Sequence, residues 1–192
     1  QSMQSLASTR GLPVSAVISE ASACSRADLL AGIQAIRDLG LIPRWNKKIF
    51  AKSVLFSNSD EKRLAQLQTA LQAPDSQLIW CVRGGYGCLR LMPELRNFKK
   101  PKRNKLLLGY SDITTLHQHF NQAWGWPSVH GPLVDRLGRG AVKGRERQIL
   151  LDLLFGRVEE VHYPSLRLLN PGQGKVTDIQ SRILGGNMAV LQ

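Results

Sequence analysis

Short continuous apolar runs and longer stretches with helical spacing follow one another along the chain. Continuous runs of strand length are typical of parallel strands that are covered on both faces. A further run at residues 41–43 contains Pro43, which lacks a ladder donor, so at most a brief strand is expected there. The clear strand-like runs lie at residues 14–18, 78–82 and 105–109.

Four stretches carry apolar residues three or four positions apart, as on one face of a helix. The first follows Ser25, which forms a capping box of the Ser-x-x-Asp type with Asp28, and Gly40 stops it. The second begins with acidic residues, which suit a helix N-terminus, and Pro74 ends it. The predicted helices cover approximately residues 25–40, 60–73, 113–120 and 146–155.

Strands that alternate with helices predict an α/β fold with a parallel sheet in flavodoxin- or Rossmann-like layers. The pattern changes after Tyr163, because proline and glycine crowd into residues 164–174 and residues 175–183 then resemble a strand. We therefore expect an α/β domain over residues 1–163. Residues 164–192 are expected to form a linker and the beginning of a smaller, β-rich C-terminal domain.

The composition is that of a globular protein, with 43% apolar and 21% charged residues among 192. No apolar run is long enough to span a membrane, and the polar N-terminus lacks the apolar core of a signal peptide. We expect a cytoplasmic location, with a periplasmic one left open. Cys24, Cys81 and Cys88 lack paired spacing, so neither a metal site nor a disulfide framework is expected, and no cofactor is predicted.

The net charge of +12 is large for a chain of this length. Such a charge suits nucleic-acid binding. However, the densest basic run, residues 99–105, has no aromatic residue among its charges to stack on bases. The pattern therefore favours a solvated loop before a strand, and nucleic acid is not the expected partner.

Three glycines follow the run at residues 78–82, in the segment Arg83-Gly84-Gly85-Tyr86-Gly87. Glycines directly after a buried strand let the backbone approach a ligand and turn its N–H groups inward. Ligands of open parallel sheets bind at the carboxyl ends of the strands, where this loop would lie. A tight strand-to-helix turn also needs glycine, and the segment matches neither common nucleotide-binding loop.

A second strand-to-helix junction lies at Ser111, in the segment Gly109-Tyr110-Ser111-Asp112-Ile113-Thr114. A strand that turns sharply at a serine before a helix resembles a nucleophile elbow, although Ile113 replaces the second glycine of that motif. The backbone N–H of Asp112 would then lie at a helix N-terminus, directed at charge that develops on a carbonyl oxygen. Taken alone, the pattern favours a simpler interpretation, in which Ser111 or Asp112 caps the helix.

A serine nucleophile needs a base, and spacing alone does not assemble a triad. His117 and His119 lie within the following helix and point in different directions. His130 follows a short strand-like segment and could lie near the site, but such a histidine is more often structural. His162 has no evident partner.

These segments together resemble the LD-carboxypeptidase family of serine peptidases. Arg83–Gly87 is similar to its R-G-G-Y-G segment, residues 109–114 to the segment that holds its nucleophile, and His130-Gly131-Pro132 to its H-G-P turn. Gly185-Gly186-Asn187-Met188 is similar to its G-G-N-L segment. Four motifs in the family's order reverse the preference for a helix cap and make Ser111 the expected nucleophile.

The resemblance implies a serine carboxypeptidase that releases terminal D-alanine from murein tetrapeptides during peptidoglycan recycling, often as a homodimer. Ser111 would form the acyl-enzyme, and backbone N–H groups of Asp112 and of Gly84 and Gly85 would hold the oxyanion. By its chemistry, Arg83 could meet a substrate carboxylate or form a structural salt bridge. Tyr86 and Asn187, which lie in the matched motifs, are further candidates for substrate contact.

The family's catalytic glutamate and histidine follow its G-G-N segment, and this sequence ends five residues after Asn187. We therefore expect little turnover from residues 1–192 alone. Two alternatives remain open: an immunity-type peptidase that cleaves a toxic peptide-nucleotide, and a non-catalytic binding module with the same fold.

Overall fold

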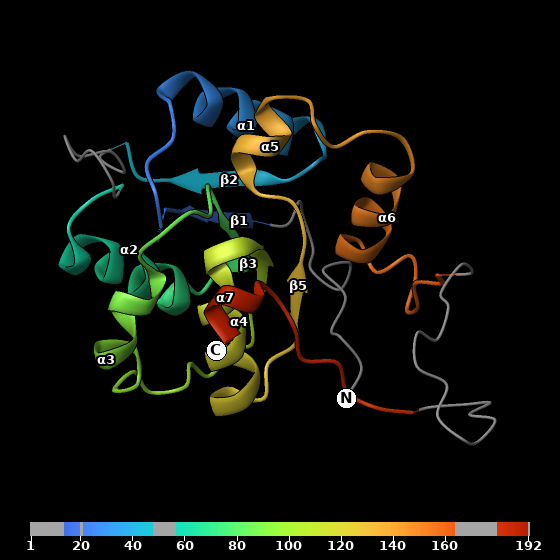
Figure 1. The fold of residues 1–192 in the computed structure, drawn as a ribbon. Coiled ribbons are helices and arrows are strands. Elements are labelled where there is room, and N and C mark those ends of the chain that lie inside the picture. Colours follow the sequence, from blue (N-terminus) through green and yellow to red (C-terminus); the bar gives the residue numbers. More distant parts are fainter. Residues whose placement is uncertain (1–13, 20, 48–56, 164–179, 192) are drawn as a thin grey trace.

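The computed structural model describes residues 14–19, 21–47, 57–163 and 180–191, and within them it contains a five-stranded parallel sheet (Figure 1). The strand order is β2-β1-β3-β4-β5, and every neighbouring pair is parallel. The predicted α/β class with a parallel sheet is therefore confirmed. The strands are β1 (Val14–Ile18), β2 (Ile42–Trp45), β3 (Ser76–Cys81), β4 (Leu106–Gly109) and β5 (Ser128–His130).

Helices connect the strands and cover both faces of the sheet (Figure 1). Short 3-10 segments follow two of the strands: η2 (Cys88–Leu91) comes after β3 by way of a loop, and η3 (Ser111–Ile113) comes after β4 by way of a single residue. The α-helices are α1 (Arg26–Asp38), α2 (Asp60–Gln72), α3 (Met92–Leu95), α4 (Thr114–Trp124), α5 (Val134–Gly138), α6 (Gly144–Leu154) and α7 (Met188–Leu191).

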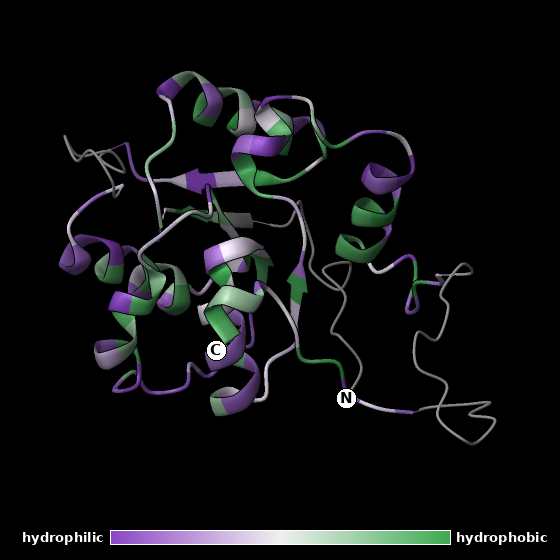
Figure 2. Cartoon of the chain, viewed as in Figure 1, coloured by the Kyte–Doolittle hydropathy of each residue, from purple (hydrophilic) through white to green (hydrophobic). Residues whose placement is uncertain are grey.

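The sheet separates two apolar cores. On one face, α2 and α4 pack against side chains of β1, β3 and β4 such as Ile79 and Leu107. On the other face, α1, α5 and α6 pack against the alternate residues, among them Trp80 and Leu108. Residues 78–81 of the central strand β3 are apolar and fully buried, whereas the edge strand β2 contains Pro43 and Arg44 and is drawn largely in the hydrophilic colour (Figure 2). This difference is what a sheet covered on both sides imposes on its central strands.

The helix boundaries follow the capping signals closely. The Ser25 side chain accepts a hydrogen bond from the Asp28 backbone N–H, and Gly40 follows the helix in a left-handed conformation. Strand β2 is longer than the brief strand expected. Pro43 is tolerated there because β2 is an edge strand that pairs only with β1.

The short helices and one predicted strand differ from the sequence prediction. Helices α3, α5 and α7 were not predicted, since four or five residues are too few for a periodic signal. The strand predicted at residues 175–183 lies partly outside the described residues, and residues 180–183 form no strand. Ile183 is 93% exposed, so its side chain packs against little in the described part of the chain. The division at residue 163 stays a prediction.

The basic run at residues 99–105 forms a mostly exposed loop before β4, and three of its cations donate to backbone carbonyl groups. Lys105 is buried, and its Nζ donates to the carbonyl oxygens of Ala73 (2.5 Å), at the end of α2, and of Ser76 (2.7 Å), at the start of β3. Lys100 Nζ donates to the Trp124 carbonyl oxygen at the end of α4, and Arg103 donates to Pro74. Cations suit the negative C-terminal ends of helices. The interpretation of the run as a solvated loop before a strand is therefore confirmed except at Lys105, which is buried.

In the portions of the chain that are described, the helices are all too short or too polar to cross a membrane.

Candidate active site

The loops that carry the sequence motifs meet at the carboxyl edge of the sheet. The chain leaves β1 towards β2 on one side and returns to β3 on the other, so the strand order reverses between β1 and β3. Open α/β sheets bind ligands outside the carboxyl ends of the strands at such a reversal. The loops after β1, β3 and β4 all begin at this edge, because the strands are parallel and their carboxyl ends lie together.

The turn after β4 is strained at Ser111. Ser111 has a φ of 66°, and no other non-glycine residue in the described segments has a positive φ. Such a conformation costs on the order of 1–3 kcal/mol and persists only where the surroundings impose it. The strand passes into η3 and then α4 directly at this residue. The sharp strand–serine–helix turn predicted from the sequence is therefore present.

The glycine loop after β3 lies directly against this serine. A Cβ built on Gly84 would be 2.7 Å from the Ser111 Cβ and 3.1 Å from its Oγ. Any side chain at residue 84 would thus occupy the space of the serine side chain. The close backbone approach predicted for this loop is made to Ser111 itself.

The acidic residue of the elbow fastens the far end of the same loop. Asp112 is buried, and its Oδ2 accepts a hydrogen bond of 2.7 Å from the Cys88 backbone N–H. Among the described residues, the Ser111 hydroxyl forms no hydrogen bond with the helix that follows, and Ile113, at the N-cap of α4, makes no side-chain cap. The interpretation of Ser111 or Asp112 as a helix cap is therefore wrong.

Ser22, in the loop after β1, holds the beginning of the same glycine loop. The Ser22 backbone N–H donates to the Gly84 carbonyl oxygen (3.1 Å), and the Ser22 Oγ accepts from the Tyr86 backbone N–H (3.0 Å). Ser22 was missed because it lies outside the four motifs that the sequence shares with the family. No local signal pairs it with residues more than sixty positions away.

His117 holds the end of strand β4 before the elbow, and neither of its ring nitrogens contacts Ser111, so it is not placed to act as the base. Its Nε2 donates to the Gly109 carbonyl oxygen (2.9 Å), and its Nδ1 accepts from the Ser128 hydroxyl (2.7 Å). Asn121 in turn donates to the Ser128 Oγ (2.9 Å). Burial lowers the pKa of His117, which keeps the imidazole neutral and suits this directional chain.

The other histidines also lie apart from the Ser111 hydroxyl. The His130 ring is exposed and packs edge-on against the Tyr110 ring, with 6.1 Å between centroids. His119 packs against Trp124, and the exposed His162 lies near Glu160. In the part of the chain that the structure describes, no histidine is hydrogen-bonded to Ser111.

Arg83 and Tyr86 flank the glycines, with Arg83 half-buried and Tyr86 67% exposed.

Burial raises the pKa of the Asp135 carboxyl, while Arg139 and Arg83 oppose that rise. Burial, together with the charge of Asp135, raises the pKa of the Cys24 thiol to about 11. Cys24 is therefore a neutral thiol and a poor nucleophile beside this site.

The Gly185–Asn187 segment lies against the first residue of α4. The Asn187 backbone N–H donates to the Thr114 Oγ1 (2.8 Å), three residues after the elbow serine. The Asn187 side-chain oxygen accepts from the Ala189 backbone N–H, so it caps α7. The structure thus brings the fourth motif to the same edge as the first two, and Thr114 is a second contact residue that the sequence did not indicate.

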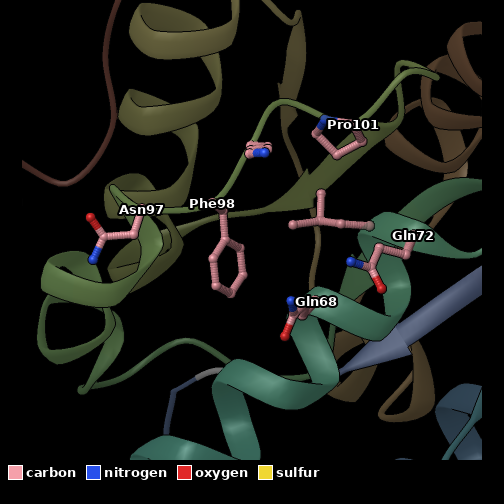
Figure 3. Close-up of a pocket in the computed structure, with 7 residues that line it drawn as sticks. Gln68, Gln72, Asn97, Phe98 and Pro101 are labelled. Carbon is pink, nitrogen blue, oxygen red and sulfur yellow. The ribbon is translucent and has the colours of Figure 1, made fainter.

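A pocket elsewhere on the molecule has a volume of about 260 Å³ and carries no comparable chemistry (Figure 3). It lies between α2 and the segment before β4, at the amino edge of the sheet. Gln68 and Gln72 project from α2 on one side, and Phe98 enters from the other. Its lining holds one ionisable side chain, that of Lys99, and no nucleophile.

Comparison with known proteins adds to this geometry. Residues 16–131 match the model of the LD-carboxypeptidase N-terminal domain. A protein of Rickettsia prowazekii is 34% identical over 185 residues, which are 94% of this chain and 56% of that protein. The murein tetrapeptide carboxypeptidase of Pseudomonas aeruginosa is 30% identical, over 92% of this chain and 58% of its own length. The chain spans about half the length of the curated relatives it matches.

Solved structures share the fold. The muramoyltetrapeptide carboxypeptidase from Oxalobacter formigenes superposes with a TM-score of 0.64 at 24% identity, over 72% of this chain and 47% of that one. An MccF-like protein from Bacillus anthracis gives a TM-score of 0.66 at 21% identity, over 76% and 45%. At these identities the likeness establishes the architecture.

Proposed function

This chain belongs to the LD-carboxypeptidase family, and on that premise we propose that it carries the nucleophile of a serine carboxypeptidase that releases terminal D-alanine from murein tetrapeptides. The observation that carries the proposal is the strained Ser111, with a φ of 66°, held against the backbone of Gly84. A strained serine at the carboxyl edge of a parallel sheet presents its hydroxyl to a ligand bound there.

In the proposed reaction the Ser111 Oγ attacks the carbonyl carbon between the diamino acid and D-alanine. The hydroxyl proton passes to a base, and then to the D-alanine nitrogen as the C–N bond breaks. Water then attacks the acyl-enzyme: its proton passes to the same base and then to the Ser111 Oγ as the ester bond breaks. The family's glutamate and histidine would supply the base, because the histidines described here do not contact Ser111.

The oxyanion would be held by backbone N–H groups of Asp112 and of Gly84 and Gly85. Two features support this assignment: Asp112 is the second residue of the 3-10 segment that leads into α4, and Gly84 lies against the serine side chain. Arg83 is proposed to bind the terminal carboxylate, since a guanidinium suits bidentate pairing. Tyr86 and Asn187 are proposed as further substrate contacts, the latter through its side-chain NH₂, since its oxygen caps α7.

The proposal is tested on the polypeptide that carries this chain as it is made in its source cell. Release of D-alanine from a murein tetrapeptide is measured for the parent and for Ser111→Ala. Loss of the nucleophile should lower kcat by at least about 1000-fold. Ser111→Gly, which relieves the strained φ, shows by its unfolding midpoint that the fold survives.

Two controls sharpen this assay. A tetrapeptide ending in L-alanine should release nothing, and a peptide-nucleotide substrate tests the immunity-type alternative. Equal D-alanine release by the parent and Ser111→Ala would overturn the proposal. Failure of every substrate with an intact fold would favour a binding module.

A cytoplasmic location and a homodimer are proposed alongside this function, and the family resemblance implies the homodimer. Peptidoglycan recycling places its peptide substrates inside the cell. Cell fractionation tests the location, and sedimentation equilibrium tests the dimer. A periplasmic fraction or a monomer at micromolar concentration would contradict the respective proposal.

A further inference from the structure

Ser22 joins the two loops between which the strand order reverses. Its backbone N–H donates to the Gly84 carbonyl oxygen, and its hydroxyl accepts from the Tyr86 N–H, so residues 84–86 are held at both ends. We infer that Ser22 is a positioning residue, which fixes the glycine loop in the conformation that stabilises the oxyanion. The catalytic part of this inference rests on the proposed function.

Packing around the loop is as tight as its hydrogen bonding. Gly85 has a φ of 106°, and a Cβ built on it would lie 2.3 Å from the Ser22 Oγ. The neighbouring Gly84 makes the equivalent close approach to Ser111. The loop is therefore held between two serines from different strands, of which one is the proposed nucleophile and the other accepts a backbone hydrogen bond.

The need for such a brace follows from the chemistry of the oxyanion. Donors must lie 2.7–3.1 Å from the oxygen of the transition state, not merely near it. Two consecutive glycines have more conformational freedom than any other pair of residues, so the backbone alone does not hold this geometry. Asp112 fixes the loop at Cys88, beyond the glycines, and Ser22 fixes it across them.

Ser22 is not itself placed to react. Its Oγ lies against Gly85 rather than Gly84, and it is engaged as an acceptor by the Tyr86 N–H. Removal of the hydroxyl should therefore leave the nucleophile and the substrate contacts in place. The loop should instead sample conformations in which its N–H groups no longer converge on the oxyanion.

A first experiment measures the amide hydrogen exchange of Tyr86 by NMR in the parent and in Ser22→Ala. Loss of the acceptor should speed exchange at Tyr86 about fivefold to tenfold. Ser25→Ala is the matched control, because Ser25 Oγ also accepts one backbone N–H, that of Asp28 at 3.0 Å. It should speed exchange at Asp28 and leave Tyr86 unchanged. Exchange at Tyr86 within twofold of the parent in Ser22→Ala would overturn the inference.

A second experiment measures D-alanine release by the same variants in the polypeptide that carries this chain. Ser22→Ala should lower kcat about 10- to 100-fold with KM within threefold, while Ser25→Ala keeps both within twofold. An unchanged kcat with a raised KM would overturn the positioning role. If the parent releases no D-alanine, the proposed function fails, and the exchange of Tyr86 still decides whether Ser22 braces the loop.

Discussion

The amino and carboxyl edges of the sheet differ in what holds their backbone groups. At the amino edge, Lys105 and Lys100 donate to the carbonyl groups that end α2 and α4, and no non-glycine residue described there has a positive φ. At the carboxyl edge, Ser111 is held at a positive φ and glycine backbone lies in contact with it. The first arrangement stabilises the fold, and the second keeps a reactive group in place at a cost to stability.

Charge follows the same division. Helix C-termini carry negative partial charge and lie at the amino edge, so the basic run finds its acceptors there. At the carboxyl edge, backbone N–H groups of loops and of the 3-10 segments are held by oxygens of Ser22 and Asp112. A high positive charge in this chain is therefore not by itself evidence for a polyanionic partner.

The largest effect is expected from a methyl group at the carboxyl edge. Gly84→Ala places a Cβ 2.7 Å from the Ser111 Cβ, so one of the two backbones must shift. Misplacement by about 1 Å costs on the order of 100-fold in rate, and loss of an oxyanion donor up to about 1000-fold. Release of D-alanine measures the change.

Gly125→Ala is the control for that substitution. Gly125 has a φ of 66° after α4, but a Cβ there meets nothing within 4 Å. It should lower the free energy of unfolding by about 1 kcal/mol without changing kcat. Activity of Gly84→Ala within tenfold of the parent would show that the loop contact does not matter.

The sequence predicted these two edges unequally. The elbow was found because strand, serine and helix are contiguous, and the first helix because Ser25 and Asp28 are three residues apart. The brace at Ser22 and the caps by Lys105 and Lys100 were not found. Each links residues 24 or more positions apart, and each depends on the strand order, which hydrophobic periodicity does not determine.

At the amino edge, the largest expected loss of stability comes from Lys105→Met. The change leaves the Ala73 and Ser76 carbonyl groups without their buried donor. Removal of one partner from a buried, charge-assisted network costs about 3 kcal/mol. Urea unfolding measures it, and kcat below the unfolding transition should remain parental. Lys102→Met, at an exposed position of the same run, should change stability by less than about 0.5 kcal/mol, and an equal loss there would contradict the capping role.

His117 links stability at the carboxyl edge to pH. Burial lowers its pKa below the usual 6.5 in the folded chain, so the unfolded chain takes up a proton first as the pH falls. The contribution of neutral His117 to the free energy of unfolding is complete above pH 6.5, and it is lost as the pH falls through the lower folded pKa. His119 shifts in the same direction for the same reason. Urea unfolding at pH values from 7.5 to 5 gives the free energy of unfolding as a function of pH. Its slope should be shallower in His117→Gln than in the parent, and shallowest in the variant in which both histidines are replaced. An unchanged slope would mean that the pKa of His117 is the same in the folded and the unfolded chain.

The smallest expected effect compares two neighbouring threonines at the start of α4. Thr114→Val removes the acceptor of the Asn187 N–H and should speed exchange of that amide about fivefold, with a loss of about 1 kcal/mol. The buried Thr115 hydroxyl has no hydrogen-bond partner among the described residues, so Thr115→Val should be neutral or stabilising. Opposite signs would show that the Gly185–Asn187 segment is attached to the elbow helix by a specific hydrogen bond. Equal losses would mean instead that packing around β-branched side chains, common to both positions, holds the segment there.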